Sequence, residues 1–268
     1  GKRLVEKKEF LASKDPWFRP VNFYVGPDGA LYVVDYYRQL VEHPEWMSDE
    51  VNKSGALYNG STKGRIYRIT KKGAGPMDWM KSVKLSATSS ADLVKLLTHK
   101  NGWYRRTAQR LLFDRKDKSA TPLLKELIAD DKALGGVQAL WLLHDSGNLD
   151  AKDLANALGS STEGIRENAL QVADRMIDKP GFANNPTLQK QLVGLSDDPS
   201  ARVRFQWLCS SGFLHLPNSA ALRAKILAKD IEDQWAGIAA IAASQDTEEA
   251  LLKSYIQTLG TSPSKGKS

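Results

Sequence analysis

The chain has 268 residues, of which 41% are hydrophobic, and this combination suits one large or two small globular domains and argues against disorder of the whole chain. Its 38 lysines and arginines exceed its 31 acidic residues to give a net charge of +7, and the excess is spread along the chain. An excess this modest and dispersed does not favour nucleic-acid binding, which draws on concentrated basic patches.

Cys209 is the single cysteine, so the chain by itself has no disulfide, no cysteine-based zinc site and no cysteine pair for the covalent attachment of haem. We expect Cys209 to lie in a buried, apolar environment. No stretch approaches the roughly 20 apolar residues of a membrane-spanning helix, and residues 1–8 lack the apolar core of a signal peptide. The sequence therefore predicts no membrane span in this chain.

Residues 1–70 have the composition of β-structure. Aromatic and β-branched residues at 23–25 and 31–34 flank the turn Gly26-Pro27-Asp28-Gly29, and this arrangement predicts a β-hairpin. A third short strand is predicted at 65–69. Three strands of this length expose their edges and bury little core by themselves.

An unfinished sheet of this kind is typical of a propeller blade, which carries four short strands in its complete form. Residues 7–12 would then supply an outer strand of the preceding blade. We interpret residues 1–70 as the last blade of an incomplete β-propeller whose other blades precede residue 1. Residues 71–84 begin with a glycine-rich and lysine-rich stretch that breaks the strand pattern and indicates a linker.

From about Ala91 onward, apolar residues return every three or four positions, which predicts short amphipathic helices. Similar helices recur at spacings of roughly 30 to 37 residues, in or just below the range of HEAT and armadillo repeats. The aligned copies begin at Trp103, Leu134, Gly164, Ala201 and Gln234. Partner helices are predicted at 122–129, 153–158, 186–195 and 220–228. The fold class is therefore mixed but mainly α, with an α-solenoid of HEAT-like repeats after a partial β-propeller.

We predict that the repeats occupy residues 85–259 as a right-handed stack of about five helix pairs, followed by a flexible tail or linker at 260–268. One helix pair cannot bury its apolar stripe alone, whereas stacked pairs make a continuous core. Small residues at matching positions would let the helices approach closely. The tryptophans of the aligned helices are expected at or near the seams between pairs: Trp103, Trp141, Trp207 and Trp235.

Four arginines at 105, 106, 110 and 115 raise the question of a phosphate-binding patch on one of these helices. Their spacings distribute them around the helix, so a solvated face with salt bridges between repeats is the better interpretation. The histidines at 99, 144 and 215 follow apolar helices, where capping of a helix C-terminus explains them. No metal site is predicted.

The order of four motifs resembles a known family. The motifs lie at 15–22 (DPWFRPVN), 26–38 (GPDGALYVVDYYR), 43–45 (HPE) and 64–69 (GRIYRI). Together they are similar to the exported proteins described as membrane-bound dehydrogenase-like or PVC-type haem-binding proteins. The resemblance implies a propeller like those of PQQ-dependent sugar dehydrogenases, then HEAT-like repeats, and commonly a small c-type cytochrome domain. It also implies a periplasmic or exported location.

The antiparallel hairpin gathers several polar residues at the sheet end opposite its turn, because the start of one strand and the end of the next share an edge. We expect His43 and Asp35 as candidate catalytic residues, since a histidine can remove a proton near neutral pH. Candidate residues for cofactor or substrate binding are Arg19, Asn22, Tyr37 and Arg38. The alternative is structural: an ion pair between Arg19 and Asp35, a loop cap at His43, and tyrosines that fill gaps.

These observations predict a fragment of an exported dehydrogenase-like protein that oxidises a sugar or alcohol, or binds carbohydrate, through its full propeller. The helical repeats would act as a spacer or docking module, and the missing blades and a cytochrome c domain would be partners. No cofactor is predicted in this chain itself, whereas the resemblance implies PQQ and c-type haem for the full-length protein. The alternative is a HEAT-repeat scaffold that binds other proteins and has no catalytic activity.

Overall fold

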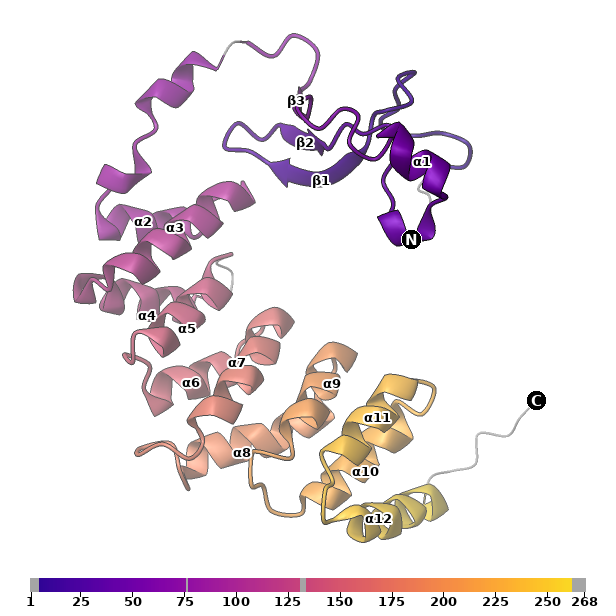
Figure 1. Cartoon of the computed structure of the whole chain (residues 1–268). Coiled ribbons are helices and arrows are strands. Elements are labelled where there is room, and N and C mark those ends of the chain that lie inside the picture. The colour runs from indigo at the N-terminus through magenta and orange to yellow at the C-terminus, as the bar shows by residue number, and fades with distance from the viewer. Residues whose placement is uncertain (1–4, 76, 131–133, 262–268) are drawn as a thin grey trace. The chain divides into compact units, whose positions relative to one another are not determined.

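The computed structural model describes residues 5–75, 77–130 and 134–261. It is mainly α-helical and contains one three-stranded antiparallel sheet (Figure 1). The chain divides into two compact units, which we describe separately. Unit 1 comprises residues 1–83 with 101–103, and unit 2 comprises residues 84–100 with 104–268. In the described part of the chain, no helix is both long and apolar enough to cross a membrane.

The sheet of unit 1 confirms the predicted hairpin and third strand. Strand β1 (Pro20–Val25) pairs with β2 (Leu31–Asp35), which pairs with β3 (Arg65–Ile69), in the order β1-β2-β3. The turn between β1 and β2 closes with the N–H of Gly26 donating to the carbonyl of Ala30 at 3.0 Å. Gly29 has a φ of 76°, a left-handed conformation that glycine adopts at little cost.

Strand β1 exposes apolar side chains on both faces of the sheet. Phe23 and Tyr24 are 53% and 52% exposed, although successive side chains of a strand point to opposite faces. On the central strand β2, by contrast, Val33 is fully buried. Residues 7–12, expected to add an outer strand, form no strand here. The expected partner was the sheet of a preceding blade, whereas the sheet of the described residues consists of β1, β2 and β3 alone.

The long connection from β2 to β3 contains two helical segments that were not predicted. A short 3-10 helix, η1, covers Pro44–Trp46, and helix α1 covers Asp49–Ser54. The side chain of Ser48 caps the start of α1 by accepting the N–H of Val51, and Gly55 ends it with a φ of 74°. These are ordinary start and stop signals, and they were present in the sequence.

Unit 2 consists of short helices, and its first helices follow the segments η2 (Asp78–Ser82) and η3 (Leu85–Ala87). The α-helices are α2 (Ser90–Leu96), α3 (Gly102–Arg115), α4 (Thr121–Ala129), α5 (Gly136–Asp145), α6 (Ala151–Leu158), α7 (Glu163–Met176), α8 (Pro186–Gly194), α9 (Ala201–Ser210), α10 (Ser219–Lys229), α11 (Gln234–Ala242) and α12 (Glu248–Thr261). Two more 3-10 segments are η4 (Lys118–Ala120) and η5 (Leu195–Asp197). Each of the four predicted partner helices is present, within two residues at either end.

The helices of unit 2 form two rows, as Figure 1 shows. In one row α5 packs on α7, α7 on α9 and α9 on α11, and in the other α4 packs on α6, α6 on α8 and α10 on α12. Contacts between the rows join α4 with α5, α6 with α7 and α10 with α11. Neighbouring contacts of this kind are those that helical repeats make, and the predicted HEAT-like, right-handed stack stays a prediction.

Small residues let the helices of the stack approach closely. Ala108, Ala139 and Ala169, which occupy matching positions in the aligned copies, are all fully buried. They belong to one continuous apolar core that runs from Leu93 on α2 to Leu251 on α12. Stacking thus buries a stripe that no single pair could bury alone.

The predicted placement of the tryptophans at the seams is confirmed for two of the four. Trp207 is fully buried, and its Nε1–H donates to the carbonyl of Leu192 at 2.7 Å. Trp141 on α5 donates to Asn168 on the next helix of its row, α7, at 2.8 Å. Trp235, however, is 60% exposed, because no helix of the described chain covers this side of α11. Trp103 is half-buried in the first turn of α3.

Two further expectations need correction or fall partly outside the described residues. Cys209 is exposed, not buried, because it lies on the outward side of α9 while Trp207 and Leu208 point into the core. Helix α12 continues through Gly260 to Thr261, so the expected tail does not begin at 260. The rest of that tail, 262–268, lies outside the described residues.

Candidate functional site

Asp35 organises the end of the sheet opposite the hairpin turn. It is 1% exposed, and its Oδ1 accepts the backbone N–H groups of Arg19 at 2.8 Å and Tyr37 at 2.9 Å. Its second oxygen, Oδ2, is buried and has no hydrogen-bond partner in the described structure. The register pairs Pro20 with Asp35, so the shared edge is where antiparallel geometry predicted it.

The two arginines of the predicted site hold the surrounding loops together. The guanidinium of Arg19 donates to the carbonyls of Phe18 and Gln39, each at 3.1 Å. The guanidinium of Arg38 donates to the carbonyl of Gly60 at 2.8 Å and stacks 4.2 Å from the ring centre of Tyr36. Contacts with backbone carbonyls satisfy donors inside the fold, and they favour a structural role for both side chains.

Tyr37 also has a structural role. Its φ of 51° is unusual for a bulky residue, and the Arg65 guanidinium lies 3.9 Å from its ring centre. Gly60 packs so closely that an added Cβ would lie 2.5 Å from the Tyr37 carbonyl oxygen. This close approach explains why glycine stands at position 60.

The remaining two predicted residues are placed differently. Asn22 is exposed in β1, and its Oδ1 accepts the N–H of Phe23 at 2.8 Å. His43 precedes η1, has a side chain that is 63% exposed, and has its Nδ1 3.9 Å from Glu45. The described contacts of His43 therefore lie within its own loop, and the structure does not join it to Asp35. Its proposed catalytic role stays a prediction.

A shallow groove lies beside this cluster. It has a volume of about 300 Å³ and is lined by Asp35, Tyr36, Arg38, Arg65 and neighbouring backbone. A buried carboxylate oxygen without a partner, next to an open groove, can accept a hydrogen bond from a ligand hydroxyl or from water. Among the contacts described at this end of the sheet, the Oδ2 of Asp35 is the group left able to accept a hydrogen bond from a ligand.

The family resemblance implies PQQ and haem for the full-length protein, and the candidate residues of this chain make their described contacts within the chain itself. PQQ is an anion, and its recognition calls for cationic donors, whereas the Arg19 and Arg38 guanidinium groups already donate to backbone carbonyls. Covalent haem attachment needs two cysteines, and the sequence holds one. Within the described ranges, no three potential metal ligands of the His, Cys, Asp and Glu type come together.

Unit 2 contains a repeated arginine contact at residues that the sequence analysis did not single out, since the salt bridges predicted between repeats concerned the arginines at 105, 106, 110 and 115. Arg166 on α7 makes two hydrogen bonds to the Asp198 carboxylate, at 2.7 and 2.8 Å, and donates to the Ser160 carbonyl at 2.8 Å. Arg204 on α9 likewise makes two hydrogen bonds to Asp230, and it donates to the Asp198 carbonyl at 2.7 Å. We call these contacts the arginine rungs.

The two arginine rungs join successive helix pairs at two junctions of the stack, and they stand at matching positions of the aligned repeats. Arg105 on α3 donates to the His99 carbonyl at 2.6 Å, six residues earlier in the chain, as Arg166 and Arg204 do to theirs. The sequence does carry a signal for these rungs. It is an arginine in the first turn of an aligned helix, with an aspartate just after the next partner helix. Two-pronged contacts between guanidinium and carboxylate fix orientation as well as contributing energy.

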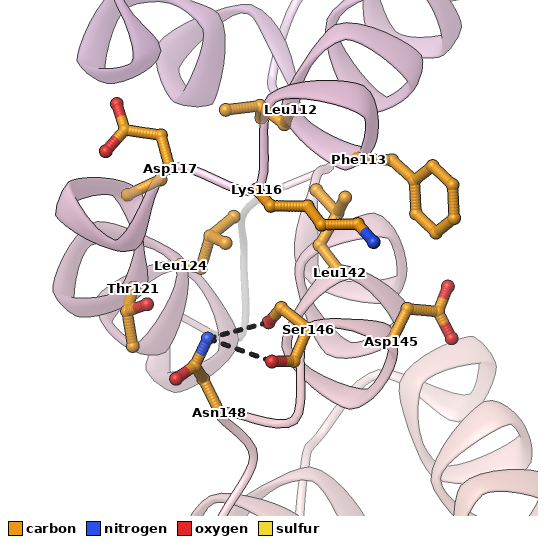
Figure 2. Close-up of a pocket in the computed structure, with 11 residues that line it drawn as sticks. Leu112, Phe113, Lys116, Asp117, Thr121, Leu124, Leu142, Asp145, Ser146 and Asn148 are labelled. Carbon is orange, nitrogen blue, oxygen red and sulfur yellow. Dashed lines mark hydrogen bonds between the residues drawn. The ribbon is translucent and has the colours of Figure 1, made fainter.

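A crevice between α3, α4 and α5 is too small for a ligand (Figure 2). Its volume is about 30 Å³, roughly the space of one water molecule. Figure 2 shows Asn148 at its edge, where the side-chain amide donates to the hydroxyl of Ser146 at 3.0 Å. We assign no function to this crevice.

A larger and more apolar groove lies among α10, α11 and α12. It has a volume of about 460 Å³, and its apolar walls come from Leu227, Ile231, Ile241, Leu251, Leu252 and Tyr255. We call it the end groove. Three of these residues, Ile231, Ile241 and Leu252, are more than half exposed at 59%, 64% and 58%. The periodicity of the sequence did not reveal the end groove, because the same apolar pattern is expected of a helix face that a neighbouring helix covers.

Further apolar side chains on the same two helices are exposed. Trp235 and Ile238 follow one another at helical spacing on α11, and Ile256 lies one turn beyond Leu252 on α12. Each of these neighbours is at least 56% exposed. Exposed apolar surface of this extent makes the two helices a candidate for contact with a partner.

Comparison with known proteins adds one match. The profile of a domain of unknown function, DUF7133, matches residues 2–73, which include the whole sheet and the loop of Asp35. This match covers about a quarter of the chain and assigns no activity to it. The search of curated proteins found no match.

Proposed function

We propose that this chain is an interaction scaffold, in which the helical stack binds another protein and carries no catalytic site of its own. The observation that carries the proposal is the exposed apolar surface around the end groove on α11 and α12. Surface apolar residues normally occur singly, whereas here Ile231, Ile241 and Leu252 are exposed and line one cavity. The arginine rungs support the proposal further, because they give the stack a defined geometry on which such a surface can be presented.

Site-specific photo-crosslinking in the cells that make the protein tests this function. A benzophenone amino acid replaces Ile238, which is 56% exposed beside the end groove. We expect a protein adduct of discrete mass that disappears when Ile241→Glu is added. The matched control places the same group at Leu134, which is 60% exposed just before α5 and should give no such adduct. Absence of any protein adduct at position 238 would contradict a scaffold role for this surface.

A second candidate is the exported dehydrogenase-like or carbohydrate-binding protein that the motifs resemble, with the sheet as one blade of a β-propeller. Two observations favour it. The sheet exposes Phe23 and Tyr24 on opposite faces, as a strand does when further β-structure is meant to cover it. The unpaired Oδ2 of Asp35 beside its groove offers an acceptor to a sugar hydroxyl.

Substitutions in the full-length protein test this candidate. If the sheet end binds a ligand, Arg19→Ala and His43→Ala should each lower turnover or ligand affinity at least roughly tenfold, about 1.4 kcal/mol, with little change in melting temperature. Arg19 donates to three backbone carbonyls. If its role is structural, Arg19→Ala should therefore lower stability while the fraction that still folds keeps its activity. His43, whose side chain is 63% exposed, would then change neither property.

A further inference from the structure

We propose that Arg223, held between the hydroxyl groups of Ser211 and Thr247, binds a small monovalent anion of the size of chloride. Arg223 lies on α10, Ser211 directly follows α9, and Thr247 directly precedes α12. The bound anion therefore ties α10 to the end of one helix and the start of another. Such a site is independent of the scaffold function, and it exists whether or not the stack binds another protein.

Arg223 is a buried cation to which no carboxylate of the described residues is bonded. Only 2% of the residue is exposed. Its guanidinium donates to the hydroxyl oxygens of Ser211 and Thr247, each at 3.3 Å, which is long for hydrogen bonds of this kind. Its Nε is buried and has no hydrogen-bond partner in the described structure. Burial alone lowers the pKa of Arg223, in agreement with the lack of a carboxylate beside it.

An arginine rung shows how the same fold accommodates another buried guanidinium. Arg204 is 5% exposed, and it makes two hydrogen bonds to the Asp230 carboxylate. It also donates to the carbonyls of Asp198 and Pro199, at 2.7 and 3.0 Å. Arg223 has neither a carboxylate nor a backbone carbonyl among its described partners. What distinguishes Arg223 is therefore the lack of an anionic partner from the described chain.

A buried guanidinium calls for an anion because it cannot lose its charge. A buried lysine or histidine can release its proton, whereas arginine stays protonated in proteins. A charge removed from water is costly unless an opposite charge and hydrogen bonds offset that cost. The hydroxyl groups of Ser211 and Thr247 already donate to the carbonyls of Leu208 and Ser244. The Nε–H of Arg223 is therefore the donor that the anion accepts.

The surroundings of Arg223 select a small anion with a single charge. Ser211 is 3% exposed, whereas Thr247 is an exposed residue, so the anion enters from the side of Thr247. Close to Thr247, Glu248 and Glu249 begin α12, and both residues are exposed. Their negative charges repel phosphate and sulfate more strongly than a halide, because repulsion grows with the charge of the anion. Burial of the guanidinium also excludes bulky carboxylates.

Thermal unfolding of the full chain tests this site. Chloride replaces gluconate stepwise at constant ionic strength, and gluconate serves as an anion too bulky for a buried site. We expect a saturable rise of the melting temperature by about 3 °C, because the anion binds the folded state alone. Arg223→Met, which removes the charge and keeps an unbranched side chain, should abolish this rise without lowering the melting temperature in gluconate. The matched control Lys225→Met removes a charge from the same helix, at a side chain 55% exposed, and should keep the rise.

Bromide locates the anion directly, because its anomalous scattering identifies it in a crystal. Crystals of the full chain grown in sodium bromide should show a bromide ion within hydrogen-bond distance of Arg223 Nε. Bromide elsewhere and not at Arg223 would overturn the proposal, and this result decides the matter even if Arg223→Met fails to fold. A rise of the melting temperature that persists in Arg223→Met, or that sulfate produces equally, would also overturn it, since the salt would then act on the whole protein surface.

Discussion

Single side chains in this molecule show how burial changes acid–base behaviour. Asp174 on α7 faces α9, where its Oδ2 accepts the hydroxyl of Ser210 at 2.9 Å and its Oδ1 is buried without a partner. Removal from water raises the pKa of the Asp174 carboxyl to about 6. The folded chain therefore holds this proton more tightly than the unfolded chain, whose aspartates titrate near 4.

This raised pKa predicts a pH-dependent stability. The contribution of Asp174 to the free energy of unfolding is largest below about pH 4, and it falls as the pH rises toward about 6. Because the carboxyl keeps some contact with solvent, we expect a change of about 1 to 2 kcal/mol, less than the full shift implies. Asp174→Asn should remove this change and stabilise the protein at pH 7.5, as urea unfolding at pH 4.5 and 7.5 would show.

A control of opposite sign is available on the same unit. Lys225 and Lys229 hold the pKa of the exposed Asp197 below its usual value. Its contribution to stability is therefore present at neutral pH and is lost as pH falls below about 4, so Asp197→Asn should not stabilise the protein at pH 7.5. Equal effects of the two substitutions would contradict our assignment of Asp174.

At the scale of helices, the stability of unit 2 depends on side chains that point into the core of the stack. Leu142 on α5 is 5% exposed and belongs to this core. Leu142→Ala should lower the free energy of unfolding by about 2 to 5 kcal/mol, because it leaves a cavity that the neighbouring helices fill only in part. Leu134→Ala, at a site 60% exposed, should change it by no more than about 0.5 kcal/mol. Chemical denaturation of the two variants side by side measures the difference.

How far the sequence predicted the elements depended on local signals. Helices α4 and α8 were predicted within one residue at either end, because Pro122 and Pro186 stand in their first turns. Helix α1 was missed although Ser48 and Gly55 mark its ends, since the surrounding residues carry no apolar stripe. The expected burial of Cys209 was wrong because the prediction considered the residue type and not the side of the helix on which Cys209 lies.

The candidate site was predictable to a similar extent. Antiparallel pairing was enough to bring Arg19 and Asp35 to one end of the sheet. Pairing could not show that Arg19 would bond the carbonyls of Phe18 and Gln39, because those acceptors depend on the path of the loops. That path includes the left-handed conformation of Tyr37, which residue type alone does not reveal. The end groove escaped prediction because a sequence does not say which apolar stripe lacks a neighbour.

At the scale of the whole molecule, the two units differ in how they are built. Unit 1 pairs strands and loops that are far apart in sequence, as where Arg38 reaches Gly60. Unit 2 joins each helix to the next one or two along the chain, so its architecture follows from repeated local packing. Local contacts of this kind form quickly during folding, whereas pairings between distant residues form more slowly. Local periodicity was accordingly the better guide for unit 2.

The arginine rungs also give unit 2 a mechanical character. Each rung links an arginine in the first turn of one helix to the aspartate that follows the next partner helix. A pulling force along the stack therefore acts on the rungs one after another. Not every junction has a rung. At the positions where α9 carries Arg204 and Phe205, α11 carries Gly237 and Ile238. Under load the stack would therefore separate first at junctions that lack a rung, and the junction at α11, beside the surface that we assign to a partner, is one of them.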